Sequence, residues 1–451
     1  MQNTKQYMLS GSIAGSIVKF AIPLFFGNLF QQLYNTADSL IVGNKLGSTA
    51  LAAVTSTGML IFLLVGFFQG IGMGAGVVIS QFFGAKENRN VSLAIHTYLA
   101  ASLVIGAFLT VFATLLAPQI LLWMGTPPEV MPMAVEYIRV YFLGSMGLVM
   151  YNACMGIMQA LGDSKHPLYY LIVSSIINIV LDLILVSGFG LGVWAAALAT
   201  IVSQFVSVVL CMYRMMRPEE TYRVTLRNLK FDRRILMMIF RIGLPTGVQN
   251  SIIAFANVVV QSNINHFGEM AMAGCGAYSK IEGFAFLPIT SFTAAITTFV
   301  GQNLGAGNRD RVRKGARFGV FCSLMLAEVI GVLFYLFAPV IIRAFTDEVF
   351  AVEFGVQKAR ICSLFYFLLA ATHSFAAVLR GAGKSVVPMI TMLAFWCVVR
   401  VGFLVILVPA TENIAVVNWV YPLTWALSSV TLFIYYIFTD WTHSTVIEKK
   451  N

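Results

Sequence analysis

Charged residues are scarce in this sequence of 451 residues, because Asp, Glu, Lys and Arg make up only 11% of it. Globular proteins carry roughly 25%. Hydrophobic residues make up 59%, and the mean hydropathy is +0.83. A chain with this balance cannot bury all its apolar side chains in a water-soluble fold. The composition therefore excludes a soluble protein and indicates one that folds within a membrane.

Patterns that bind metals or nucleotides are missing as well. The six cysteines are dispersed inside hydrophobic runs without a CxxC pair, and the five histidines form no HExxH or His/Cys cluster. The glycine-rich stretch GIGMGAG at 70–76 lacks the GK[ST] ending of a phosphate-binding loop, and no Walker motif occurs elsewhere. We expect no metalloenzyme centre, no resident cofactor and no step driven directly by ATP.

What the sequence does contain is a series of hydrophobic runs, each long enough to cross about 30 Å of hydrocarbon as a helix. Lipid offers no hydrogen-bond partners to open strand edges, so helices are required. A closed barrel would show alternating segments about half as long. We predict an all-α polytopic membrane protein with twelve transmembrane helices, at about 16–42, 50–78, 92–117, 133–158, 168–188, 193–216, 236–264, 271–300, 316–341, 355–379, 387–409 and 416–438.

Lys and Arg are distributed unevenly between the connections of these helices. Of 29 such residues, 21 fall on one set of alternate connections, whereas the other set is mostly acidic. The positive-inside rule places the basic set in the cytoplasm. The net charge of +10 then reflects topology and not nucleic-acid binding. We expect a multi-pass protein of the plasma or inner membrane with both termini cytoplasmic.

Segments of the first half recur in the second half. One match pairs QFFGAKENRNV (81–91) with QNLGAGNRDRV (302–312), and another pairs GIMQALGDSKHPL (156–168) with AVLRGAGKSVVPM (377–389), both at the same offset along the chain. We predict a lobe of six helices at 1–216, a basic cytoplasmic linker at 217–235 and a second lobe of six at 236–451. Because six is even, the lobes are expected to be parallel repeats related by a pseudo-two-fold axis along the membrane normal, as in secondary transporters.

Four acidic residues lie within the hydrophobic runs: Asp38, Asp182, Glu282 and Glu328. A carboxylate at the bilayer centre costs roughly 3 kcal/mol on insertion scales, and such residues usually line a cavity or an ion path. They can also form ion pairs that hold helices together. Lys280 is a candidate partner for Glu282, and Arg400 for Glu328, so both roles stay open for these two acids.

Asp38 and Asp182 are predicted to lie at one depth. Counted at about 1.5 Å per residue from the cytoplasmic end of its helix, each falls in the outer half of the membrane. Asn178 precedes Asp182 by four residues and shares its helical face. Thr200 lies at the same depth on the next helix, and the carbonyl of Ala196 would join it if that helix end is frayed.

Such a cluster has two chemical uses. Its oxygens, with their net negative charge, suit a cation such as Na⁺, whereas two close acids in a low dielectric can share a proton. Either ion moving inward releases about 2.3 kcal/mol per charge per 100 mV, which can drive export of another solute. At the equivalent positions the second half carries Val259 or Val260 and Phe403, so the acids are not duplicated with the architecture. We interpret five residues as a cation- or proton-coupling site, with Na⁺ as one candidate ion: Asp38, Asn178, Asp182, Thr200 and Ala196.

Several segments are specific when they are taken together: AIPLFFGNLFQQLYNTADSLIVGNKLG, QFFGAKENR, GQNLGAGNRDR, ALGDSKHP, LRGAGKSVVP, and INIVLDLIL followed by GVWAAALAT. With them the chain resembles the multidrug and toxic compound extrusion (MATE) family of cation-coupled exporters over nearly its whole length. The resemblance implies two six-helix lobes and antiport by rocking. It carries a first-lobe cation site onto the five residues just given, and it makes Pro23 a candidate hinge in the first helix.

The resemblance also separates two branches of the family. Members resembling the NorM branch carry a Glu and an Asp at positions that are Ile253 and Leu369 here. This departure favours the branch similar to the DinF proteins. Glu282, with Lys280 and Arg400 nearby in the membrane, is then the candidate polar site of the second lobe.

The leading hypothesis is an antiporter that exports amphipathic, cationic compounds in exchange for Na⁺ or H⁺. One alternative is a flippase of lipid-linked oligosaccharides, whose cavity would hold more bases than Lys280 and Arg400. A channel, or an intramembrane enzyme with Asp38 and Asp182 as a catalytic pair, lacks a supporting motif. The expected partners are an amphipathic small molecule and membrane lipids, with no nucleic acid, and we expect a monomer.

Overall fold

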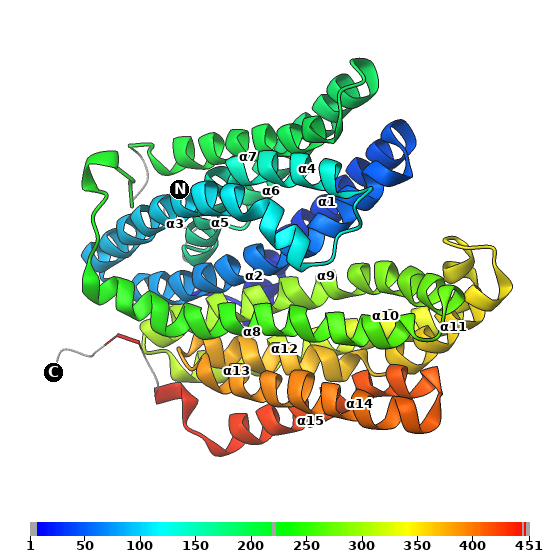
Figure 1. Ribbon diagram of the computed structural model, residues 1–451. Helices are drawn as coiled ribbons and strands as arrows, with labels where there is room; N and C mark the ends of the chain where they lie inside the picture. The colour runs from blue at the N-terminus through cyan, green and yellow to red at the C-terminus, as the bar shows by residue number, and fades with distance from the viewer. Residues whose placement is uncertain (1–6, 219–221, 444–445, 448–451) are drawn as a thin grey trace. The chain divides into compact units, whose positions relative to one another are not determined.

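The computed structural model describes residues 7–218, 222–443 and 446–447 (Figure 1). Within these ranges every regular element is a helix, as predicted. The α-helices are α1 (Ile13–Leu46), α2 (Ser48–Gly84), α3 (Asn88–Trp123), α4 (Met131–Leu143), α5 (Ser145–Ala160), α6 (Lys165–Asp182), α7 (Val193–Met215), α8 (Arg233–Asn265), α9 (Glu269–Gly305), α10 (Arg309–Arg343), α11 (Val349–Ser363), α12 (Tyr366–Gly381), α13 (Val386–Met392), α14 (Arg400–Thr411) and α15 (Ile414–Phe438).

The twelve predicted crossings are accounted for in the described residues. Ten spans are single stretches of helix long and apolar enough to cross a membrane, and two more are bent pairs. In these pairs α4 meets α5 at 50° and α11 meets α12 at 52°. The two breaks fall at Gly144 and Phe365, which are separated by the same offset as the repeated motifs.

The backbone repeats elsewhere at this offset. Gly47 and Gly268 adopt φ values of +91° and +90° at the starts of α2 and α9. This left-handed region is readily available only to glycine. The duplication inferred from sequence is therefore present in the backbone as well as in the motifs.

Packing divides the chain into two compact units. The first unit comprises residues 26–243, and the second unit combines the residues up to Phe25 with those from Leu244 onward. The boundaries fall inside α1, shortly after Pro23, and inside α8, just before Pro245. The lobes at 1–216 and 236–451, with their linker at 217–235, and the hinge at Pro23 stay predictions. Both chain ends lie outside the described residues, so their cytoplasmic location also stays a prediction.

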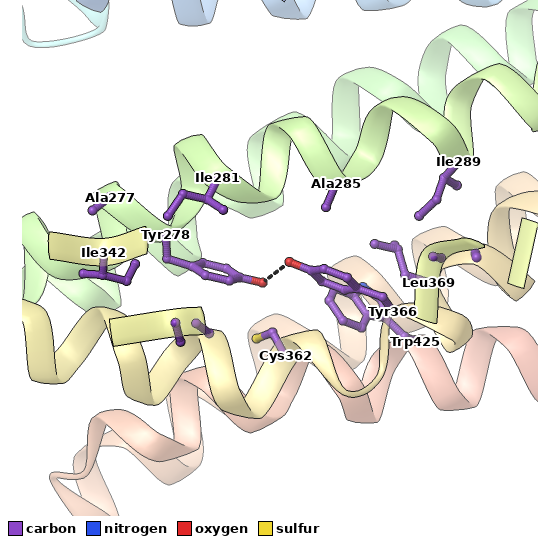
Figure 2. Close-up of a cluster of buried hydrophobic side chains, with 14 of the residues drawn as sticks. Ala277, Tyr278, Ile281, Ala285, Ile289, Ile342, Cys362, Tyr366, Leu369 and Trp425 are labelled. Carbon is purple, nitrogen blue, oxygen red and sulfur yellow. Dashed lines mark hydrogen bonds between the residues drawn. The ribbon is translucent and has the colours of Figure 1, made fainter. Parts of the chain in front are cut away.

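The second unit is built around α9, which packs against α10, α11 and α12. Figure 2 shows part of its core, where Tyr278 of α9 points toward Tyr366 of α12. Their hydroxyl oxygens are 2.9 Å apart. The contact between α9 and α11 is close because Gly274 and Gly355 face each other there. Small residues of this kind let helix backbones approach within a membrane.

Candidate ion-coupling site

Two buried carboxylates lie together in the first unit. Asp38 of α1 is 9% exposed, and Asp182, the last residue of α6, is fully buried. Their side chains are close enough to interact directly. The chain changes from α- to π-helix immediately after Asp182, over Leu183–Gly188. π-helical turns of this kind are frequent at functional sites.

Asn178 and Thr200 join α6 to α7 beside these acids. The Asn178 side-chain nitrogen donates to the Thr200 hydroxyl at 3.5 Å, and that hydroxyl donates to the carbonyl of Ala196 at 3.1 Å. The frayed helix end that would free the Ala196 carbonyl is not observed, because α7 is regular from Val193 onward. This carbonyl therefore holds Thr200 in place and is not free of hydrogen bonds.

The most informative feature of the site is a set of oxygen atoms that lack hydrogen-bond donors. Five buried oxygens at this site have no hydrogen-bond partner among the described residues: Asp38 Oδ1, Asp182 Oδ1, Asp182 Oδ2, Asn178 Oδ1 and Gln204 Oε1. All five accept hydrogen bonds, and an acceptor buried without a donor is costly. The fold therefore maintains an excess of acceptors that a cation or a proton would satisfy.

Sequence reasoning missed two tyrosines beside the acids, Tyr34 and Tyr137. The Tyr34 hydroxyl lies near the side chains of Gln31 and Gln204 and in the field of Asp38. Tyr137 of α4 lies in the field of both acids. The spacing of four residues between Tyr34 and Asp38 places them on one helical face, so that pair was detectable. Nothing in the sequence pattern distinguishes Tyr137 from an ordinary core tyrosine.

The predicted polar site of the second unit is rearranged. Lys280 is exposed and makes no ion pair with Glu282 among the described residues. The Tyr278 hydroxyl donates to Glu282 Oε1 at 3.2 Å, and Lys358 and Arg400 are the bases whose charge acts on this acid. Lys358, which sequence reasoning did not single out, lies buried within α11.

Glu328 has a partner other than Arg400. Its Oε2 accepts from the backbone N–H of Phe367 at 3.2 Å. That N–H belongs to the first turn of α12, just beyond the break from α11, where backbone donors lack helical partners. A carboxylate is favourable at this positive end of a helix. The predicted pairing with Arg400 is therefore wrong, and Glu328 caps a helix.

A duplicated helical membrane fold that buries two adjacent carboxylates in its first unit is typical of a secondary transporter. The MatE family model matches residues 23–184 and 245–406, two segments of equal length that together cover most of the chain. The chain belongs to the MATE family, whose members are multidrug transporters and not enzymes.

Individual relatives agree with this assignment. The chain is 31% identical to the probable multidrug resistance protein YoeA of Bacillus subtilis, covering 95% of this chain and 94% of that protein. It is 29% identical to the probable multidrug resistance protein NorM of Thermotoga maritima, covering 85% and 83%. A solved transporter of Pyrococcus furiosus, described as having a binding pocket of reverse polarity, matches with a TM-score of 0.90 at 26% identity over 96% of both chains.

Proposed function

We propose that this protein exports amphipathic organic compounds, chiefly cations, in exchange for Na⁺ or H⁺ that enters through the Asp38–Asp182 site. The five unpartnered oxygens support this proposal most directly. An ion that binds them in one state of the transporter and leaves in another couples its own gradient to export. The names of the relatives, which are multidrug resistance proteins, support the same cargo class.

The donor set fits Na⁺ or a proton better than a transition metal. Every candidate ligand is an oxygen of a carboxylate, an amide, a hydroxyl or a backbone carbonyl, and such hard ligands suit hard cations. The described residues contain no group of three or more His, Cys, Asp and Glu side chains that could hold a metal. Two adjacent carboxylates can also hold one proton between them. The two ions therefore remain alternatives for the same atoms.

An apolar pocket in the first unit offers a place for the cargo. Its walls come from α2, α3, α4 and α5 and include Phe68, Tyr98, Tyr141 and Asn152. Mostly apolar walls with a few polar groups suit an amphipathic compound. Tyr141 also stacks on Tyr137, with the ring centroids 6.2 Å apart, and Tyr137 lies in the field of both acids. Binding of the ion and binding of the cargo can thus communicate through these two tyrosines.

The second unit supports the finer classification within the family. Leu369 is buried in its core, and Ile253 packs against that core. Neither residue can bind a cation, so we place the chain in the branch similar to the DinF proteins. We further propose a monomer of the plasma or inner membrane with cytoplasmic termini, in contact with lipid and the amphipathic cargo.

Export from proteoliposomes tests the coupling ion. We expect a fluorescent organic cation such as ethidium to move against its own gradient when an opposing Na⁺ or pH gradient is imposed separately. One of these gradients should suffice, because in one-for-one exchange a tenfold ion gradient supplies about 1.4 kcal/mol, which corresponds to about tenfold accumulation of the cargo. A rate that is the same with both gradients collapsed by ionophores would refute coupling.

A further inference from the structure

Lys358 is a buried cation without a counter-ion in contact. Its side chain is 2% exposed, and it makes no hydrogen bond or ion pair with any residue that the structure describes. The ammonium nitrogen lies 5.3 Å from the ring centroid of Tyr278 and 5.2 Å from that of Tyr421. Aromatic faces favour the charged form of a desolvated ammonium but do not neutralise it.

Arg400 is a second buried cation in the same place. It is 1% exposed, and its guanidinium carbon lies 4.6 Å from the ring centroid of Tyr421, the ring that Lys358 also contacts. One terminal nitrogen donates to the Thr424 hydroxyl at 2.8 Å, whereas Nε is buried without a partner in the described chain. A guanidinium carries its charge at every accessible pH.

Charge counting shows what this cluster lacks. It contains two cations and one acid, Glu282, which forms no ion pair with either base in the described chain. Buried charges are normally paired, so one negative charge is missing. We propose that Lys358 and Arg400 form a binding site for a monovalent anionic group, either a halide or the carboxylate of an aromatic acid.

The surroundings of the two cations favour a small or aromatic occupant. The Trp396 ring centroid lies 5.2 Å from the Arg400 guanidinium carbon, and the Tyr421 ring lies close to both cations. Flat apolar walls of this kind fit the ring of an organic acid. A diphosphate carries more negative charge than the single charge that is missing, so a lipid-linked sugar is a poor occupant. Glu282 and Tyr421, which lie beside the two cations, are partly exposed.

Equilibrium binding tests this site without requiring transport. Purified full-length protein in an uncharged detergent and a chloride-free sulfate buffer is titrated by calorimetry with chloride, benzoate and benzamide. We expect saturable binding of chloride, benzoate or both, and none of benzamide, which has the same ring without the charge. Chloride alone would identify a halide site, and benzoate would identify a site for organic acids.

Removing a positive charge and removing a negative charge from the cluster should change anion binding in opposite directions. Arg400→Gln and Lys358→Gln should each weaken anion binding about tenfold or more, the usual effect of losing a charged partner. Glu282→Gln removes a repelling charge and should strengthen binding by about threefold to tenfold. Lys280→Gln, which alters an exposed cation on α9, is the matched control and should change nothing.

Each alternative outcome contradicts the proposal. The site is refuted if no anion binds saturably, if benzamide binds as well as benzoate, if Arg400→Gln retains full affinity, or if Glu282→Gln weakens binding. The Asp38→Asn variant separates this proposal from the ion coupling of the first unit. It should lose ion-driven export while it binds the anion with unchanged affinity.

Discussion

The Asp182→Asn variant is expected to lose ion-driven export entirely, down to the leak rate of empty liposomes. Asparagine keeps the shape of the side chain but removes its charge and replaces one of two unpartnered acceptor oxygens by a donor. Loss of a charged ligand weakens binding by about 10- to 100-fold. The coupling ion then no longer occupies the site at ordinary concentrations. Uptake of a fluorescent organic cation into proteoliposomes under an imposed gradient measures the loss.

Thermal unfolding distinguishes a functional acid from a structural one in this variant. A buried carboxylate without a donor costs folding free energy, so its neutral isostere should leave the melting temperature unchanged or raise it. Glu129→Gln makes the same chemical change at an exposed loop position and should alter neither export nor stability. A marked fall in melting temperature with export retained would show that Asp182 holds the fold together and does not bind the ion.

Much of the fold was predictable because membrane physics limits the choices. Hydrophobic length located the ten to twelve candidate spans of the described residues, and the offset that relates the repeated motifs also relates the left-handed glycines Gly47 and Gly268. The two helix breaks were not predictable. Gly144 is one of 37 glycines in the chain, and nothing in the sequence pattern marks Phe365 as a helix break.

The candidate sites were predictable to different degrees. Helical spacing placed Asn178 beside Asp182, and the depth count placed Thr200 near both. In the structure the Asn178 side chain donates to the Thr200 hydroxyl. In the second unit the same rule argues against an ion pair between Lys280 and Glu282, because residues two positions apart point to different faces of a helix. Lys358 was not recognised as a buried residue, because it lies in the first turn of the hydrophobic run at 355–379. Hydropathy does not distinguish a loop from a helix at the end of such a run.

The Gly274→Ala variant is expected to destabilise the second unit strongly for the addition of a single methyl group. A Cβ at this position would lie 2.1 Å from the carbonyl oxygen of Ala351 and 2.8 Å from the amide nitrogen of Gly355. Both are backbone atoms, so α9 and α11 must move apart. Overpacking of this kind costs about 1–3 kcal/mol. A fall in the melting temperature of the purified protein, followed by intrinsic fluorescence, measures the cost.

Gly276 on the same helix provides the control, because a Cβ there would meet no atom within 4 Å. Gly276→Ala should be neutral or should stabilise α9 by about 1 kcal/mol or less, as alanine favours a helix over glycine. Tyr278 and Lys358 are in contact about one helical turn after Gly274 and Gly355. If α9 and α11 move apart, Tyr278 also moves away from Lys358. Gly274→Ala should therefore weaken anion binding in the second unit as well. Equal melting temperatures for the two alanine variants would contradict the close crossing, because the added methyl group is the same in both.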